Sequence, residues 1–135
     1  MYLVKVEVKE SIINGKGVFS LEEISKGKIV WKFDPLHDKT LSVQEFNELD
    51  QTEKSELKRV AYLSTSSGLY VYPPEGDPAL FTNHSKDHNL SVLIDKVISE
   101  EPYFIANRDI HTGEELTNNY SEFDESLKKV KLDWI

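Results

Sequence analysis

A polar stretch at residues 80–89 carries the side chains best suited to chemistry in this sequence. Its order is Leu-Phe-Thr-Asn-His-Ser-Lys-Asp-His-Asn, and five members carry flat amide, imidazole or carboxylate groups. Such groups recognise a polar ligand well and fill an apolar core badly. Leu80 and Phe81 come first and could anchor the segment to a core. The stretch therefore predicts a ligand-binding turn, with a solvated loop as the alternative.

A glycine-containing turn at residues 14–17 is a second candidate. Its sequence is Asn14-Gly15-Lys16-Gly17. Glycine permits positive φ and lets the backbone approach a ligand closely. Most such turns only connect the strands of a hairpin, so this one indicates a ligand only in the company of other motifs.

Two histidines in the polar stretch raise the alternative of a metallohydrolase. His84 and His88 have the i, i+4 spacing that can hold zinc on a helix. Ser85 stands where the zinc pattern has its catalytic glutamate. The chain has no cysteine, which excludes disulfides, thiolate zinc sites and a cysteine nucleophile. We therefore expect no metal in the site.

Length and composition predict one soluble globular domain. The chain has 135 residues, 39% hydrophobic and 30% charged, and its six Phe, six Tyr and two Trp argue against disorder. The start of the chain lacks the apolar core of a signal peptide, and no apolar run approaches a membrane span. We expect an intracellular protein, cytoplasmic or nuclear (on host chromatin), that has no membrane partner.

The net charge of −8 bears on the binding partner. It disfavours direct binding to a nucleic-acid backbone and favours a basic protein or peptide. Acidity that serves only solubility is the alternative.

The periodicity of the chain predicts many short strands and few helices. Strands are expected at residues 2–9, 18–21, 28–33, 69–72, 90–98, 103–107 and 114–120. Helices are expected at 42–49, with Ser42 and Glu45 as a capping box, at 52–63, capped by Asp50 or Thr52, and at 123–132. The chain does not alternate strand and helix as a doubly wound sheet does.

Three motifs in this order resemble the SET-domain family of protein lysine methyltransferases. The first is Gly-Lys-Gly-Val-Phe at residues 15–19. The second is Phe-Thr-Asn-His-Ser at 81–85 together with Asn89. The third runs from residue 106 to Tyr120 through Gly-Glu-Glu-Leu-Thr at 113–117. The resemblance covers nearly the whole chain.

The chain also departs from the family pattern. Lys86 and His88 stand where cysteine and proline are frequent, and Asn118 where a Phe or Tyr often helps to set the number of methyl groups. The cysteine-rich zinc segments that often flank such domains are absent, as in the minimal SET proteins of viruses and bacteria. A partner subunit, as in a homodimer, could take their place.

The resemblance implies a fold. It is mainly β with short helices, arranged as several small sheets with a knot-like C-terminal threading. It implies a single SET domain over residues 1–135, with the C-terminal segment, about 121–135, closing the site.

The resemblance also implies methyl transfer from S-adenosylmethionine to a lysine ε-amine of a basic, histone-like protein. Tyr120 would be the catalytic residue, with its hydroxyl facing the methyl group and its ring lining the channel for the lysine. The residues implied to bind the cofactor are Asn14, Gly15, Lys16, Gly17, Tyr70, Asn83, His84, Phe123 and Trp134. For Tyr70, Phe123 and Trp134, plain core packing is the competing interpretation. A catalytically inactive SET-like module that binds a basic peptide is the main functional alternative.

Overall fold

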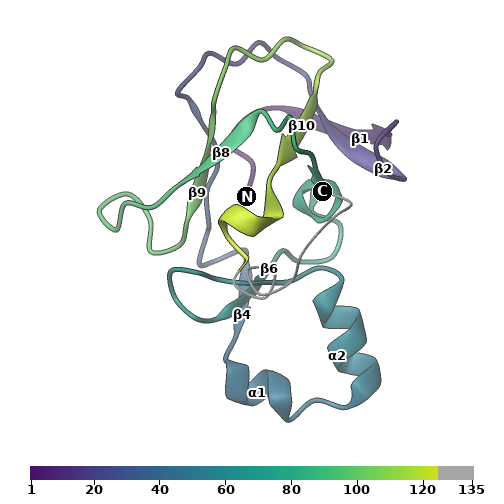
Figure 1. Cartoon of the computed structure of the whole chain (residues 1–135), viewed down its shortest axis with the longest axis vertical. Coiled ribbons are helices and arrows are strands. Elements are labelled where there is room, and N and C mark those ends of the chain that lie inside the picture. The colour runs from purple at the N-terminus through teal and green to yellow at the C-terminus, as the bar shows by residue number, and fades with distance from the viewer. Residues whose placement is uncertain (125–135) are drawn as a thin grey trace.

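Ten short strands form three small sheets in the computed structural model, which describes residues 1–124 (Figure 1). The strands are β1 (Val6–Glu10), β2 (Lys16–Ser20), β3 (Ile29–Trp31), β4 (Lys39–Leu41), β5 (Tyr62–Leu63), β6 (Tyr70–Tyr72), β7 (Asn83–His84), β8 (Leu90–Leu93), β9 (Tyr103–Ala106) and β10 (Glu115–Asn118). The helices are α1 (Val43–Asn47) and α2 (Gln51–Lys58), with two 3-10 turns, η1 (Pro78–Phe81) and η2 (Tyr120–Glu122). The predicted fold class, mainly β with short helices, is confirmed.

The three sheets have the strand orders β1-β2-β10-β7, β3-β9-β8 and β4-β6-β5. Helices α1 and α2 lie together at one end of the molecule, beyond β4 and β6 and away from the β1–β2 hairpin (Figure 1). The core is formed where the first two sheets meet, and Val18, Val30, Ala106 and Leu116 are completely buried there. Among residues 1–124, every helix is too short and too polar to span a bilayer.

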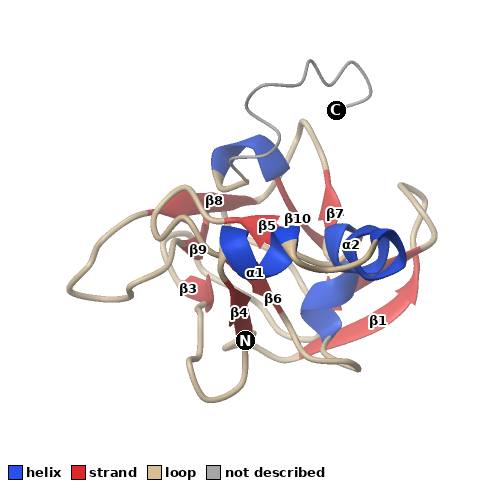
Figure 2. Cartoon of the chain, turned by 90° about the horizontal axis from the view of Figure 1, so that it is seen from below, coloured by secondary structure: helices blue, strands red, loops and turns tan. Residues whose placement is uncertain are grey.

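The parallel pairing of β7 with β10 brings the polar stretch beside the segment of Tyr120. Thr117 is paired with Asn83, and Asn118 with His84 (Figure 2). On its other edge β10 is antiparallel to β2, with Leu116 opposite Val18. The predicted knot-like arrangement requires these neighbours.

Asn89 fixes the position of β10 through both ends of its amide. Its Nδ2 donates to the carbonyl oxygen of Glu115 (2.8 Å), and its Oδ1 accepts from the backbone N–H of Thr117 (2.9 Å). Asn89 is almost completely buried. Because buried polar groups need partners, this side chain stabilises the arrangement in which both backbone groups of β10 are paired.

Several element boundaries differ from the prediction. The capping box of Ser42 and Glu45 is confirmed, and Asp50 caps α2. The predicted helix at 52–63 is wrong in its second half, because α2 ends at Lys58 and residues 62–63 pair with β6 instead. The strand predicted at 90–98 ends at Leu93. At residues 62–63, pairing with β6 outweighs the local helical propensity. After Leu93 the chain turns at Asp95, whose carboxylate accepts from the N–H of Val97 (3.0 Å).

The predicted anchor of the polar stretch also needs correction. Phe81 is exposed, whereas Ala79 packs against the core and Leu80 is half-buried. The cause is η1, which turns the chain before the strand begins. The helix predicted at 123–132 falls mainly on residues 125–135, which lie outside the described part. The single domain over 1–135 and its closing segment stay predictions.

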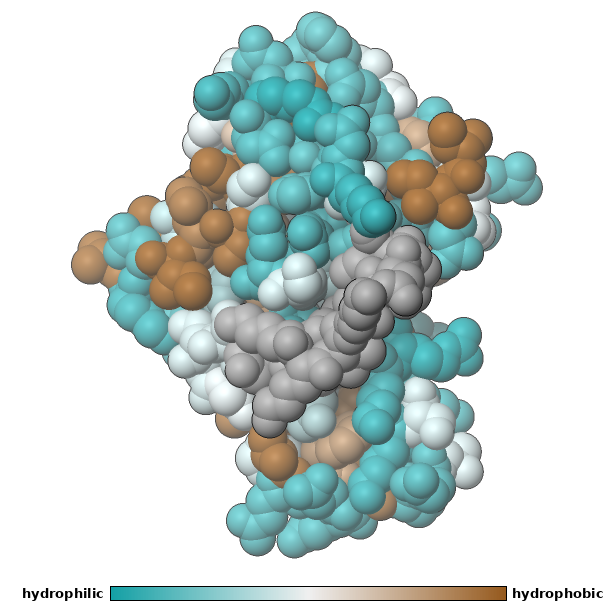
Figure 3. Space-filling view, viewed as in Figure 1, coloured by the Kyte–Doolittle hydropathy of each residue, from teal (hydrophilic) through white to brown (hydrophobic). Residues whose placement is uncertain are grey.

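The surface seen in Figure 3 is mostly hydrophilic. Hydrophobic side chains gather near the β8–β9 loop, where Ile94 and Val97 are exposed, and beside the β1–β2 hairpin, where Ile12 and Ile13 are exposed.

Replacing Asn89 by alanine should strongly destabilise the fold. The change orphans two buried backbone groups of β10, and each such group costs ~1–3 kcal/mol. We expect a loss of about 2–4 kcal/mol in the free energy of unfolding, measured with urea. Asn47→Ala, at an exposed position of α1, is the control and should change stability by less than ~0.5 kcal/mol. Equal effects of the two changes would contradict this role of Asn89.

Candidate functional site

The side chain of Asn83 ties the glycine turn to β10. Its Nδ2 donates to the carbonyl oxygens of Lys16 (3.1 Å) and Asn14 (3.2 Å) and to Oε2 of Glu115 (2.8 Å). The other carboxylate oxygen of Glu115 accepts from the hydroxyl of Ser11 (2.6 Å). Three segments far apart in the sequence therefore meet at one buried amide.

Gly17 leaves room for this meeting. A Cβ at this position would lie 2.3 Å from Oε2 of Glu115, so that carboxylate would have to move, and 3.1 Å from Nδ2 of Asn83, a tight contact. Gly15 serves a different purpose, since its φ of +47° is a turn conformation that favours glycine, and a Cβ there would meet nothing within 4 Å. The two positions thus favour glycine for different reasons: close packing at Gly17 and backbone conformation at Gly15.

His84 holds the start of η2 as a neutral imidazole. Its Nδ1 accepts from the backbone N–H of Tyr120 (3.0 Å), and the two rings meet edge to face at 5.1 Å. Burial lowers the pKa of His84 below its usual 6.5, and the nearby charges of His88 and Lys86 act in the same direction. The acceptor at Nδ1 is therefore available at neutral pH.

Two tyrosines converge on Thr82. The hydroxyl of Tyr120 donates to the carbonyl oxygen of Thr82 (2.7 Å), while the hydroxyls of Tyr2 and Thr82 share a hydrogen bond of 2.6 Å. Burial raises the pKa of Tyr120 above its ordinary value of 10. This phenol keeps its proton at neutral pH, so it can orient a reacting group but is a poor base.

A cavity of about 320 Å³ lies against these tyrosines. We call it the aromatic cavity, because six aromatic residues line it: Tyr2, Trp31, Tyr62, Phe104, Tyr120 and Phe123. Four charged residues, Asp38, Lys58, Arg59 and Asp124, also lie in its wall. Four buried polar atoms of residues lining it have no hydrogen-bond partner among residues 1–124: Nε1 of Trp31, Oδ1 of Asp38, the hydroxyl of Tyr62 and Oδ1 of Asn118. Unpaired buried groups are costly, and these four belong to residues of the cavity wall.

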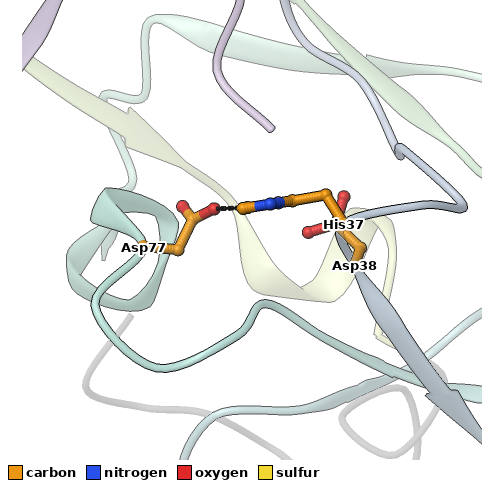
Figure 4. A group of neighbouring side chains, drawn as sticks. All are labelled: His37, Asp38 and Asp77. Carbon is orange, nitrogen blue, oxygen red and sulfur yellow. Dashed lines mark hydrogen bonds and ion pairs between the residues drawn. The ribbon is translucent and has the colours of Figure 1, made fainter.

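A hydrogen-bonded group of His37, Asp38 and Asp77 holds the loop at residues 34–38 against η1 (Figure 4). Nε2 of His37 contacts Oδ2 of Asp77 at 2.5 Å, and Oδ1 of Asp77 accepts from the N–H of Ala79 (2.7 Å). Oδ2 of Asp38 pairs with the α-amino group of Met1 at 3.2 Å. The three side chains could offer metal ligands within 4.8 Å of one another. Their visible contacts are those of a clamp that positions η1 and, through it, Thr82.

Of the other predicted cofactor residues, Phe123 lies at the aromatic cavity and Tyr70 does not. Phe123 is buried, with its ring 5.0 Å from those of Tyr62 and Phe104 and 6.1 Å from Tyr120. Tyr70 stacks on Phe46 at 4.3 Å and does not line the aromatic cavity. Trp134 lies outside the described residues.

The helical zinc spacing of His84 and His88 does not apply. His84 lies in β7, and the residues after it form a turn. Nε2 of His88 contacts Glu122 at 3.3 Å, whereas Nδ1 of His84 is engaged by Tyr120. The two imidazoles therefore do not share a helix face.

Three residues of the site were not predicted from the sequence: Tyr2, Thr82 and Glu115. Tyr2 belonged to an alternating apolar pattern, which indicates a strand face and nothing more. Thr82 contributes a backbone carbonyl, which every residue has, and a hydroxyl to Tyr2. Thr82 and Glu115 both lie inside motifs quoted above, and this position was the signal that could have been used.

The comparisons with known proteins agree with this geometry. The SET domain model matches residues 15–121, and the chain therefore belongs to the SET-domain family. No curated protein matches the chain.

Among solved structures, a Plasmodium falciparum protein assigned as a histone methyltransferase matches with a TM-score of 0.56 and 22% identity, covering 87% of this chain and 93% of its own. At that identity the likeness shows the fold alone. Apo ctPRC2 with two mutations in Ezh2 matches with a TM-score of 0.68 and 27% identity over 96% of this chain. A humanized mutant of the Chaetomium thermophilum Polycomb Repressive Complex 2, bound to an inhibitor, matches with a TM-score of 0.61 and 24% identity over 93% of this chain. The match spans only 16% of each of these two larger chains.

The role of Gly17 can be separated from that of Gly15 by a double-mutant cycle with Glu115→Ala. Gly17→Ala should destabilise the protein because it displaces the carboxylate of Glu115, so most of its cost should vanish when that carboxylate is absent. The expected coupling is about 1 kcal/mol or more in urea unfolding. Gly15→Ala strains the turn without touching Glu115, so its cost should be the same in both backgrounds. Additive behaviour of Gly17→Ala would contradict the proposed contact.

The titration of the histidines gives a second test. We expect the NMR pKa of His84 to lie below 6.5, because burial disfavours its charged form. The pKa of His111 should lie above 6.5, because Glu23 accepts a hydrogen bond from its ring. The contribution of neutral His84 to stability should be complete above pH 6.5 and lost as pH falls through its lowered pKa. A pKa of His84 above 6.5 would contradict a neutral imidazole that accepts from the N–H of Tyr120.

Proposed function

We propose that this protein transfers a methyl group from S-adenosylmethionine to a lysine ε-amine of a basic protein. The observation that carries the proposal is the position of Tyr120. Its hydroxyl donates to the carbonyl of Thr82, and its ring lines the aromatic cavity. Thr82 directly precedes Asn83, whose side-chain amide binds the glycine turn. Members of the SET-domain family are typically protein lysine methyltransferases that use this cofactor, and the family membership supports the assignment.

The residues of the glycine turn fit the cofactor. The backbone at Asn14, Gly15 and Lys16 is exposed on one side and held by Asn83 on the other. In the proposal, this turn, with Gly17, Asn83 and His84, would hold the cofactor, whose bound form supplies a methyl group on a positively charged sulfur. Phe123 and Trp134 belong to the proposed set as its C-terminal wall, and Tyr70 is its least supported member.

The cavity would prepare the amine. A free lysine has a pKa of about 10.4, and an aromatic, water-poor wall disfavours the ammonium and so lowers that pKa. Because the proton of Tyr120 is donated to Thr82, the lone pairs of its hydroxyl are left to accept from the amine or from the polarised methyl group. Alignment of the reacting atoms is worth up to ~7–11 kcal/mol.

The substrate class follows from charge. With a net charge of −8, the protein should attract a lysine-rich segment and repel nucleic acid. A basic, histone-like protein is therefore the proposed substrate, and an intracellular location is part of the same proposal.

Tyr120→Phe is the direct test. The change keeps the ring and removes the hydroxyl, so we expect methylation of core histones to fall by ~10²–10³ while the affinity for S-adenosylmethionine changes little. Tyr103→Phe, a buried tyrosine that does not line the cavity, is the matched control and should keep its activity. Calorimetry should show that cofactor binding survives a chelator.

Two outcomes would contradict the proposal. Full activity of Tyr120→Phe would make Tyr120 a packing residue. Histone binding by the wild type without any methyl transfer would identify an inactive peptide-binding module instead.

A further inference from the structure

Tyr2 is the second tyrosine whose hydroxyl reaches Thr82, and no step of the proposed reaction uses it. The hydroxyl of Tyr2 and Oγ1 of Thr82 lie 2.6 Å apart, while the carbonyl oxygen of the same threonine accepts from the hydroxyl of Tyr120 at 2.7 Å. Both tyrosines line the aromatic cavity. One residue is therefore held by two phenols, one on its side chain and one on its backbone.

Pairing with β3 places the side chain of Tyr2. The backbone of Tyr2 forms an antiparallel bridge with Trp31. Next to it, the N–H of Leu3 donates to the carbonyl oxygen of Val30 (2.8 Å). The ring of Tyr2 packs against the hydrophobic core. Because its backbone and ring are already held, the side chain loses little further freedom when its hydroxyl binds Thr82.

The carbonyl of Thr82 needs a restraint of this kind, because it lies just before the β7–β10 ladder begins. That ladder pairs Asn83 and His84 with β10 and leaves Thr82 outside. On its other side Thr82 ends η1, where its N–H makes a long hydrogen bond to the carbonyl oxygen of Ala79 (3.3 Å). Within residues 1–124, the side chain of Thr82 is hydrogen-bonded by Tyr2 alone.

We propose that Tyr2 is a positioning residue for methyl transfer: by fixing the side chain of Thr82, it fixes the carbonyl that orients the hydroxyl of Tyr120. The inference rests on the proposed function and deepens it, since the hydroxyl of Tyr2 acts through Thr82 and not on the reacting atoms. The hydroxyl of Tyr120 has to face those atoms, and a displacement of about 1 Å at a reacting centre lowers a rate by up to ~10²-fold.

Tyr2 takes no proton in this scheme. Burial raises the pKa of its hydroxyl well above the ordinary value of 10, and the charge of Asp77 acts in the same direction. The phenol therefore keeps its proton at neutral pH, and its bond to Thr82 joins two neutral groups. Its removal should lower turnover by one common factor between about pH 7 and pH 9, without shifting the pH profile.

The experiment measures kcat, KM and cofactor affinity in variants that each remove one half of the Tyr2–Thr82 hydrogen bond. Tyr2→Phe keeps the ring in the core, and Thr82→Val keeps the carbonyl and the branched shape. With core histones and labelled S-adenosylmethionine, we expect each change to lower kcat by about tenfold, a smaller loss than that of Tyr120→Phe. KM for histones and the calorimetric Kd for the cofactor should change by less than about twofold.

The two losses should not be additive. Once either hydroxyl is removed the bond is gone, so the double variant should be as slow as a single one. Thr82→Ser keeps the hydroxyl and should restore most of the rate lost in Thr82→Val. Urea unfolding shows which variants are folded, and Thr82→Val tests the role should Tyr2→Phe fail to fold.

Tyr62→Phe is the matched control. Tyr62 lines the same cavity and packs against the same core. Its hydroxyl, however, has no hydrogen-bond partner in the described part of the chain. The change removes a hydroxyl from the cavity wall without releasing Thr82, so kcat should stay at the wild-type value.

The outcomes separate the two proposals. Normal kcat in Tyr2→Phe, while the wild type methylates histones, would overturn the positioning role and leave the proposed function in place. A rise in KM alone, or an equal loss in Tyr62→Phe, would also overturn that role, since each indicates a general effect on the cavity. Additive losses would overturn the action of Tyr2 through Thr82. A wild type that binds the cofactor and methylates no basic protein would overturn both proposals.

Discussion

The parallel contact between β7 and β10 is the interaction on which the site depends. Strands of two and four residues have little stability of their own. The contact persists because side chains from the polar stretch supply hydrogen bonds that the short ladder cannot. Asn89 pairs with two backbone groups of β10, and Asn83 donates to the carboxylate of Glu115. His84 accepts from the backbone N–H of Tyr120, just after the end of β10. The polar stretch, whose side chains suit ligand binding, therefore also stabilises the fold.

This double role explains why the polar residues are buried. Asn83, His84 and Asn89 are each less than one-tenth exposed, which would be costly for unpaired groups. Their pairing also fixes the electrostatic character of the site. His84 is neutral because its pKa is lowered, and Tyr120 is neutral because its pKa is raised, both by burial. His84 and Tyr120 thus enter the site as neutral dipoles beside the carboxylate of Glu115, and in the proposed reaction the substrate amine would lose its proton to solvent.

The convergence of Asn83, His84, the glycine turn and Tyr120 was predicted from the resemblance of their three motifs to the SET-domain family, and not from the local chemistry of any one of them. The capping box was predictable from its local sequence, since all of its hydrogen bonds lie within four residues. The strand β5 at residues 62–63 was not predictable, because these residues fit a helical pattern. Their pairing with β6, which begins seven residues later, outweighs that pattern. Tyr2 could not have been identified either, since its partner, Thr82, is eighty residues away and no local pattern marks the pair.

One step along the chain separates the two halves of the site. Successive side chains of an extended segment point to opposite faces, about 3.3 Å apart along the strand. Thr82 and Asn83 occupy such a step: the groups of Thr82 engage two tyrosines at the aromatic cavity, and the amide of Asn83 engages the glycine turn. A cofactor on the Asn83 side and an amine on the Thr82 side would therefore meet across a single extended backbone. The carbonyl of Thr82 and the hydroxyl it orients lie at that boundary, where a methyl group in transit would need its oxygen neighbours.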